Sequence, residues 1–304
     1  MKVYLLAPKE NWICDRQLQE WETHMSHVTT NSIADCDVAW LLAGWCWNQI
    51  HPDVLRQKKV IVSEHHIVPE KFDEQKLCSF KARDELVDAY HVPNEITAAY
   101  IRKLTTKPIH IIPYWYNPDL WFFENKIECR NFLNLPTDKF IVGSFQRDTE
   151  GGSRNPKLEK GPDLFVDYLI NLNRDDLLVL LGGWRREYIC DRLTTAGIKY
   201  TGIELAPLEI LRKMYASCDL YVVSSRYEGG PQALYEASVM KVPIISRDVG
   251  LAKKILCKNC IVDIPNEIYY PTISDIELNF NNVKKYNIRV HKDEYFKMLN
   301  EVLK

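Results

Sequence analysis

Two glutamates eight positions apart, Glu228 and Glu236, flank a Gly-Gly-Pro turn and carry the clearest chemical potential in this chain. Each carboxylate can accept hydrogen bonds from neighbouring hydroxyl groups, so the pair suits a polyhydroxylated ligand. Gly229 and Gly230 allow close backbone approach and can present N–H groups to anionic oxygens. On spacing alone, a solvated helix cap with a glutamate on its surface fits the segment equally well.

Two predicted elements position these glutamates. The apolar run 219–223 predicts a buried parallel strand, and residues 232–240 predict a helix with Pro231 in its first turn. Glu228 is then expected at the carboxyl end of the strand and Glu236 within the following helix. Ligands of open α/β sheets bind at that end of the strands.

Two cationic residues, Arg147 and Lys160, precede the glutamates in the sequence, and each also stands beside the end of a predicted strand or helix. Arg147 follows a predicted strand that contains Gly143, and Lys160 stands directly before Gly161 and a predicted helix. Together they can hold a diphosphate and neutralise the charge that develops on a leaving nucleoside diphosphate. Without the downstream glutamates, ordinary surface charges would be the simpler interpretation.

A third glycine-containing strand end reads Gly182-Gly183 and indicates close backbone approach to a ligand. A plain left-handed turn explains a lone Gly-Gly equally well. No predicted strand is followed by Gly-x-Gly-x-x-Gly, which disfavours a dehydrogenase.

Length and composition limit the kinds of protein to which this chain can belong. The chain has 304 residues, which favours two domains of about 150 residues each, and its net charge of −2 gives no support to nucleic-acid binding. Nine cysteines, an odd number, favour reduced thiols and a cytoplasmic location. Cys257 and Cys260 form a single C-x-x-C without a second pair, so we expect a structural pair and no metal. No run approaches the ~20 apolar residues of a transmembrane segment, which leaves only peripheral membrane contact open.

Strand-like and helix-like runs alternate along the whole chain, which predicts an α/β fold with parallel sheets. A connector rich in proline and aromatic residues near 115–125 divides it. We therefore expect an amino-terminal domain at 1–120, a second domain at 121–290, and a terminal helix at 291–304 that packs on either half. The predicted strands are 2–6, 38–42, 59–63, 87–91 and 109–112 in the first half, and 139–145, 177–181, 199–201, 219–223 and 243–246 in the second.

In this order the motifs resemble the nucleotide-sugar domain of the group-1 family of retaining GT-B-fold glycosyltransferases. The matching features run from Gly143 to Arg147, then Lys160-Gly161, Gly182-Gly183, Asp219 and the E-x7-E segment from Glu228 to Glu236. The resemblance covers about residues 138–264. It implies two Rossmann-like domains that face each other across a cleft.

The resemblance also implies roles. Arg147 and Lys160 would hold the donor diphosphate, Glu228 the donor sugar and Glu236 the ribose hydroxyls, with the backbone of Gly229 and Gly230 beside them. Such enzymes need no bound metal, since the cations take its place, and they retain the anomeric configuration. The leaving diphosphate is expected to take the acceptor proton on the same face. Cleft closure would exclude water from the donor.

The first half departs from the family pattern. Pro8–Trp12 stands where a glycine-rich loop is usual, which leaves the acceptor undefined. His65 and His66 follow a predicted strand, and we expect one of them, preferably His65, to contact the transferred sugar or position the acceptor. Trp40, Trp45 and Trp47 could line an acceptor groove, although core packing is the commoner use of tryptophan.

The sequence therefore predicts a retaining hexosyltransferase that uses a nucleoside-diphosphate sugar as donor and has no bound cofactor. UDP is slightly preferred over GDP, and the acceptor is an undefined glycan, lipid or protein. Two alternatives remain open: a nucleotide-sugar epimerase of the same fold, and a non-catalytic nucleotide-sugar-binding protein.

Overall fold

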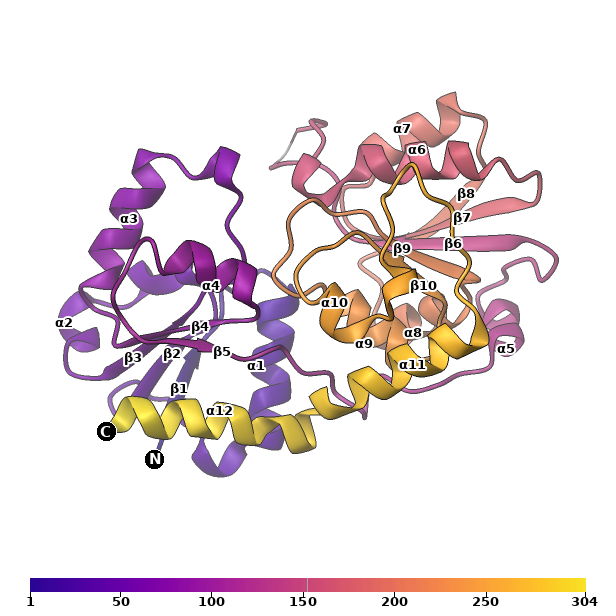
Figure 1. Ribbon diagram of the computed structural model, residues 1–304. Helices are drawn as coiled ribbons and strands as arrows, with labels where there is room; N and C mark the ends of the chain where they lie inside the picture. The colour runs from indigo at the N-terminus through magenta and orange to yellow at the C-terminus, as the bar shows by residue number, and fades with distance from the viewer. Residues whose placement is uncertain (152) are drawn as a thin grey trace. The chain divides into compact units, whose positions relative to one another are not determined.

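The computed structural model describes residues 1–151 and 153–304 and divides the chain into two compact α/β units. Unit 1 comprises Met1–Trp115 and Ile288–Lys304, and unit 2 comprises Tyr116–Asn287 (Figure 1). The terminal helix α12, Ile288–Leu303, belongs to unit 1. The predicted α/β class with two parallel sheets is confirmed, and each sheet has five strands.

Unit 1 is built on a parallel sheet whose spatial order follows the chain, β1-β2-β3-β4-β5. The central strands are buried on both faces, which explains their continuous apolar sequences. The strands are β1 Val3–Leu6, β2 Val38–Leu41, β3 Lys59–Ser63, β4 Ala89–Val92 and β5 Ile109–Ile111. The α-helices between them are α1 Ile13–His24, α2 Pro52–Leu55, α3 Glu74–Asp84 and α4 Glu95–Ile101.

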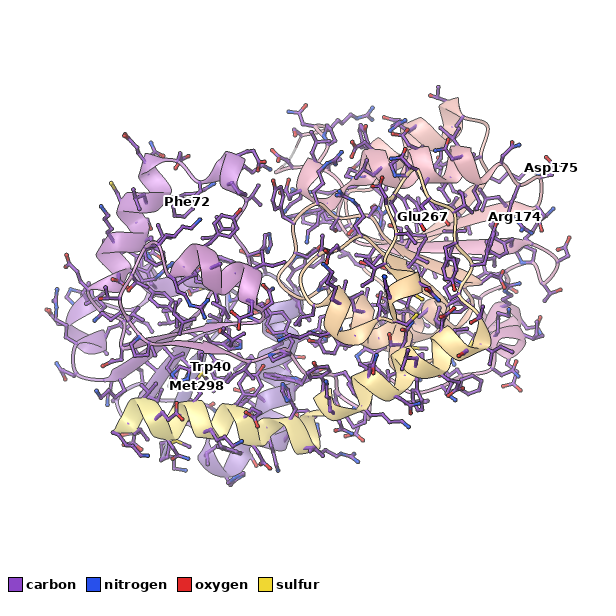
Figure 2. The ribbon with its side chains drawn as sticks, viewed as in Figure 1. Trp40, Phe72, Arg174, Asp175, Glu267 and Met298 are labelled. Carbon is purple, nitrogen blue, oxygen red and sulfur yellow. The ribbon has the colours of Figure 1, made fainter. Side chains whose placement is uncertain are left out.

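Aromatic side chains join helix α12 to the core of unit 1. Tyr295 is fully buried, and its ring centroid lies 5.5 Å from that of Trp40 and 6.2 Å from that of Trp21. Met298 of α12 belongs to the same core as Trp40 (Figure 2). The helix is thus held by burial of one apolar side, which stabilises each large side chain by roughly 1.5–3 kcal/mol.

Unit 2 has the strand order β10-β9-β6-β7-β8, all parallel. The chain runs outward from β6 through β7 to β8, then returns to place β9 on the other side of β6. Its strands are β6 Phe140–Phe145, β7 Leu177–Gly183, β8 Tyr200–Glu204, β9 Leu220–Val223 and β10 Ile244–Ser246. The α-helices are α5 Lys126–Phe132, α6 Pro162–Leu172, α7 Glu187–Thr195, α8 Leu208–Ala216, α9 Gln232–Val239, α10 Ala252–Ile255 and α11 Ile273–Val283.

Asp219 joins the start of β9 to α5 and to β6. Its carboxylate accepts hydrogen bonds from Arg130 Nη2 at 2.5 Å, from Lys126 Nζ at 2.7 Å and from the Ile141 amide at 2.8 Å. Burial alone would raise the pKa of Asp219, but these three donors outweigh it and hold the pKa below its ordinary value. The aspartate therefore acts as a structural anchor in its ionised form.

Candidate functional site

The reversal of strand order in unit 2 lies between β6 and β9, which pair directly. At such a point the loops that leave the two strands diverge and open a crevice at their carboxyl ends, where ligands of open α/β sheets bind. Arg147 lies in the loop after β6, and Glu228 lies in the loop after β9. The topology thus selects the same edge of the sheet that the sequence motifs indicate.

Lys160 and Glu228 meet at this edge although 68 positions separate them. Lys160 Nζ donates to Glu228 Oε1 at 2.6 Å, and Ser225 Oγ donates to the same oxygen at 3.0 Å. Their side chains are 22% and 12% exposed, so the ion pair is only partly screened by water. Two residues predicted for one site are therefore in direct contact.

The backbone of Lys160 is fixed by the strand ends around it. Its carbonyl accepts hydrogen bonds from Gln146 Nε2 at 3.0 Å, Ser224 Oγ at 3.3 Å and Ser225 Oγ at 3.4 Å. Gly161, the next residue, has a φ of +62°, and a β-carbon there would lie 2.1 Å from the Ser224 carbonyl oxygen. Only glycine allows this approach, which places the lysine at the start of α6.

The loop that carries Glu228 is held from two sides. Arg226 forms a forked ion pair with Asp163 of α6, with N–O distances of 2.7 and 2.6 Å, and its amide donates to the Glu159 carbonyl at 2.8 Å. On the other side Gly250, with a φ of +54°, approaches so closely that a β-carbon would lie 2.5 Å from the Gly229 carbonyl oxygen. These contacts fix the backbone beside Glu228 before any ligand binds.

Glu236 lies in α9 in different surroundings. Only 3% of the residue is exposed, and its carboxylate adds to burial in raising the pKa of Tyr215 well above its ordinary value. The ring of Tyr215 packs against that of Tyr221 at an angle of 41°, with centroids 4.8 Å apart, and the Tyr221 hydroxyl accepts a hydrogen bond from the Phe145 amide at 3.0 Å. Glu236 thus belongs to a buried polar network behind the end of β6.

Gly143 within β6 and the glycine pair that ends β7 are required by packing within the unit. A β-carbon on Gly143 would lie 2.5 Å from Cys218 Sγ. Gly183 has a φ of +96°, and a β-carbon there would lie 2.7 Å from the Gln146 carbonyl oxygen; Gly182 is similarly crowded. Contacts within the chain thus account for these glycines, so their predicted role in binding a donor remains a prediction.

Arg186 is a residue of this edge that sequence reasoning missed. Its Nη1 lies within hydrogen-bond distance of the carbonyl oxygens of Ser144, Gln146 and Gly182, at 2.7, 2.6 and 2.6 Å. Its Nε lies 3.4 Å from the fully buried carboxylate of Asp148. Burial lowers the pKa of Arg186. The guanidinium ties the ends of β6 and β7 together, and residue type alone gave no sign of this.

Arg147 lies half-buried between Gln146 and Asp148, both of which contact Arg186. The loop that carries it is therefore anchored on both sides of the arginine. The position agrees with a cation held near the carboxyl end of β6, and contact with a diphosphate stays a prediction.

His65 lies in unit 1, after β3. Its Nε2 lies 2.8 Å from the Leu42 carbonyl oxygen and 3.4 Å from Cys14 Sγ, and its Nδ1 forms a short hydrogen bond with the Tyr114 hydroxyl. A carbonyl can only accept, so Nε2 carries the proton and, in the neutral imidazole, Nδ1 accepts from the tyrosine. Both ring nitrogens are engaged within unit 1, and the predicted contact with a sugar is untested.

The tryptophans of unit 1 divide between core and surface. Trp40 is 1% exposed and donates from Nε1 to Ser63 Oγ at 2.9 Å, so it packs in the core, the commoner use of tryptophan, and does not line an acceptor groove. Trp45 is 57% exposed, and its ring centroid lies 6.0 Å from that of His65. Of the two, only Trp45 offers an aromatic surface to solvent.

In the loop after β1, residues other than glycine adopt positive φ angles, and a carboxylate binds the backbone N–H groups. Lys9 and Asn11 adopt φ values of 60° and 54°. The Asp15 carboxylate of α1 accepts the backbone N–H groups of Lys9 at 2.8 Å, Glu10 at 2.8 Å and Trp12 at 3.2 Å. A carboxylate of the chain itself therefore occupies the N–H groups that a glycine-rich loop would leave for an anion.

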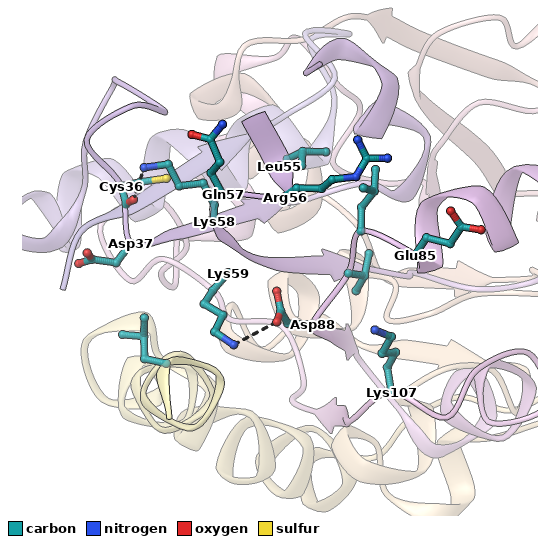
Figure 3. Close-up of a pocket in the computed structure, with 13 residues that line it drawn as sticks. Cys36, Asp37, Leu55, Arg56, Gln57, Lys58, Lys59, Glu85, Asp88 and Lys107 are labelled. Carbon is teal, nitrogen blue, oxygen red and sulfur yellow. Dashed lines mark hydrogen bonds and ion pairs between the residues drawn. The ribbon is translucent and has the colours of Figure 1, made fainter. Parts of the chain in front are cut away.

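A cavity of about 670 Å³ lies in unit 1 near the amino ends of β3 and β4 (Figure 3). Two of its lysines already have partners. Lys59 Nζ lies 3.2 Å from Asp88 Oδ1, and Lys58 Nζ donates to the carbonyl oxygens of Ala34 and Cys36 at 2.6 and 2.9 Å. The cavity faces the end of the sheet opposite to the one at which ligands of such folds bind.

Throughout the described ranges, no helix is long and apolar enough to cross a membrane.

Comparison with known proteins places the same segment in a family context. Residues 152–267 match the family model described as "Glycosyl transferases group 1". Glycogen synthase 2 of Geobacter metallireducens is 35% identical over 103 residues, which are 32% of this chain and 21% of that protein. The lipopolysaccharide core biosynthesis mannosyltransferase LpsB of Rhizobium meliloti is 27% identical over 180 residues, 56% of this chain and 48% of that protein. The matched regions thus span less than half of each relative.

Solved structures resemble the whole chain. The structure of Anabaena Alr3699/HepE in complex with UDP and glucose has a TM-score of 0.73 at 13% identity, over 99% of this chain and 100% of that one. Sucrose-phosphate synthase of Thermosynechococcus elongatus has a TM-score of 0.69 at 18% identity, over 98% and 80%. At these identities the likeness establishes the fold: the chain consists of two Rossmann-like domains of the GT-B class.

Proposed function

We propose that this protein is a glycosyltransferase that moves a hexose from a nucleoside-diphosphate sugar to an acceptor hydroxyl with retention of configuration. The observation that carries the proposal is the 2.6 Å contact between Lys160 and Glu228 at the strand-order reversal of unit 2. A cation for phosphate and a carboxylate for sugar hydroxyls thus share one edge. The match of residues 152–267 to the group-1 family model supports the same assignment.

The diphosphate would bind Lys160 alongside Glu228. Lys160 Nζ has three donor hydrogens and can bind a phosphate oxygen while it stays near the carboxylate. The positive end of α6, which begins one residue after Gly161, would favour the same negative charge. Arg147 would supply a second cation, and fixed cations stabilise a leaving diphosphate without reorganisation.

The transfer step then balances without a protein base. The bond from the anomeric carbon to the diphosphate oxygen breaks, the acceptor oxygen bonds to that carbon on the same face, and the acceptor proton passes to the leaving diphosphate. Glu228 would accept hydrogen bonds from the hexose. Glu236 would reach a ribose only if the network around Tyr215 opens, because 3% of the residue is exposed.

UDP is the preferred nucleotide of the donor. Two similar structures, Alr3699/HepE and the pneumococcal O-GlcNAc transferase GtfA, contain UDP in their complexes. This favours UDP over GDP as the first nucleotide to test here.

Calorimetric titration of UDP and GDP, followed by transfer assays with UDP-glucose and GDP-mannose, tests the proposal. Lys160→Ala should weaken nucleoside diphosphate binding about tenfold or more, since a charge-assisted contact contributes about 1.5–3 kcal/mol. Glu228→Gln should leave UDP affinity within about threefold but reduce turnover, because its partner is the sugar. Retention is read from the anomeric coupling of the product.

Glu277→Ala is the matched control, because Glu277 forms an ion pair of the same 2.6 Å length with Lys241 elsewhere in unit 2. It should change neither binding nor turnover. Release of an isomerised free sugar from the donor alone would point to the epimerase instead. Failure of the wild-type protein to bind either nucleotide would refute the proposal.

A further inference from the structure

Three potential metal ligands converge in unit 2, outside the edge described above. Cys257 precedes and Cys260 ends the short 3-10 helix η5, Lys258–Cys260, and Asp275 lies in the first turn of α11. Their sulfur and carboxylate atoms all lie within 4.8 Å of one another, and the exposed fractions of the three residues are 6%, 0% and 6%. The fold thus adds a carboxylate to a cysteine pair that looked isolated in the sequence.

The spacing of these atoms is close to that of a zinc site. Zn–S bonds of about 2.3 Å and Zn–O bonds of about 2.0 Å at tetrahedral angles place two sulfurs about 3.8 Å apart and a sulfur and an oxygen about 3.5 Å apart. Cys257 Sγ lies 3.4 Å from Cys260 Sγ and 3.2 Å from Asp275 Oδ1. Each distance needs to change by only a few tenths of an ångström. A disulfide would require the sulfurs to approach to about 2.05 Å.

Neighbouring polar groups orient these ligands. One oxygen of Asp275, Oδ2, accepts hydrogen bonds from Tyr269 Oη at 2.5 Å and from Thr272 Oγ1 at 2.7 Å. The other oxygen, Oδ1, faces Cys257. Asn279 Nδ2 lies 3.6 Å from Cys260 Sγ, where it can donate to a thiolate. Hydrogen bonds of this kind hold the side chains that coordinate a metal in the right orientation.

A fourth ligand can come from solvent. Lys258 and Asn259, the two residues between the cysteines, are exposed, so water can reach the edge of the cluster. Asn259 Nδ2 also donates to Asp275 Oδ1 at 3.3 Å and would have to release it when a metal binds.

We propose that Cys257, Cys260 and Asp275 bind one Zn²⁺ ion with a water molecule as fourth ligand. Zinc binding releases the two thiol protons to solvent. The zinc ion takes no part in the proposed transfer from the nucleotide sugar. The ion would fasten the segment after α10 to α11, within the unit that also contains Gly250 and its contact with Gly229. The proposal does not depend on the proposed transferase activity, and it replaces the expectation of a purely structural cysteine pair.

Metal content of the untagged protein, purified without chelators, is the direct test. We expect about one zinc per chain by elemental mass spectrometry, falling below about one tenth in Cys257→Ser and Cys260→Ser. Cys36→Ser is the control, because Cys36 is also buried and its Sγ donates to the Ile33 carbonyl at 3.2 Å, as a serine hydroxyl can. It should keep the full zinc content.

Replacement by Co²⁺ gives a second measurement on the wild-type protein. Thiolate ligation should produce intense sulfur-to-cobalt charge-transfer absorption, which Cys260→Ser abolishes and Cys36→Ser retains. A wild-type protein with no zinc and no such absorption would overturn the proposal, even if the variants fail to fold. A Cys257–Cys260 disulfide in the freshly purified protein, detected by its mass, would overturn it equally.

Discussion

Replacement of Gly161 by alanine tests how Lys160 is positioned. Gly161 has a φ of +62°, and a new β-carbon would lie 2.1 Å from the carbonyl oxygen and 2.8 Å from the carbonyl carbon of Ser224. Both distances are far inside van der Waals contact. Either the start of α6 or the end of β9 must therefore move, and Lys160 must shift with it.

The cost of Gly161→Ala has two parts. A left-handed conformation costs a residue with a β-carbon about 1–2 kcal/mol. Forced overlap in a packed region costs about 1–3 kcal/mol more. Together they predict destabilisation by about 2–5 kcal/mol, and for a domain of this size each kcal/mol lowers Tm by about 2–4 °C.

Gly197→Ala isolates the overlap. Gly197 has a φ of +69°, but among the described residues other than its chain neighbours no atom lies within 4 Å of a β-carbon placed there. Thermal unfolding should show a small Tm decrease for Gly197→Ala and one at least twice as large for Gly161→Ala. Only Gly161→Ala should also weaken UDP binding. Equal Tm changes in the two variants would refute the inference that the Ser224 contact positions Lys160.

Two further predictions concern the scaffold of unit 2. Arg186→Lys keeps the charge but loses the contacts of Nε with Asp148 and of Nη2 with the Ser144 hydroxyl, so urea unfolding should show a loss of about 3 kcal/mol. A loss below about 1 kcal/mol would contradict the assigned role. The ionised carboxylate of Asp219 stabilises the fold, because folding lowers its pKa. This contribution is complete at pH values above the ordinary aspartate pKa and is lost as pH falls through the lowered pKa. Asp219→Asn should therefore be less stable than wild type at pH 7, and the difference in unfolding free energy should shrink below about pH 4; a constant difference would contradict the assignment.

Much of the fold could be predicted because buried parallel strands have continuous apolar sequences. Two helices, α3 and α11, could not be predicted in this way. Helix α3 buries only Phe80 and Arg83 and so has a weak apolar pattern. Helix α11 buries Asp275, Asn279 and Val283, two of which are polar. Their positions depend on partners elsewhere in unit 1 or unit 2 rather than on local spacing.

The residues of the candidate site also include some that the local sequence predicts and some that it does not. Lys160 and Glu228 could be predicted because each stands beside a turn with a distinctive local sequence. Arg186 could not, because its role depends on carbonyl groups from two neighbouring strands that only the folded sheet brings together. Asp275 was missed for the same reason, since helix α11 brings it to Cys257 through packing.

Strand order explains why the two units differ in how far the sequence could be interpreted. In unit 2 the order reverses beside β6, so the loops that follow β6 and β9 border one crevice, and motifs at those strand ends acquire a common position. In unit 1 the order never reverses, and the side chain after β3, His65, contacts Leu42 and Tyr114 of its own unit. A sequential sheet defines no crevice within itself. The topology therefore favours unit 2 for the proposed nucleotide site independently of the E-x7-E motif.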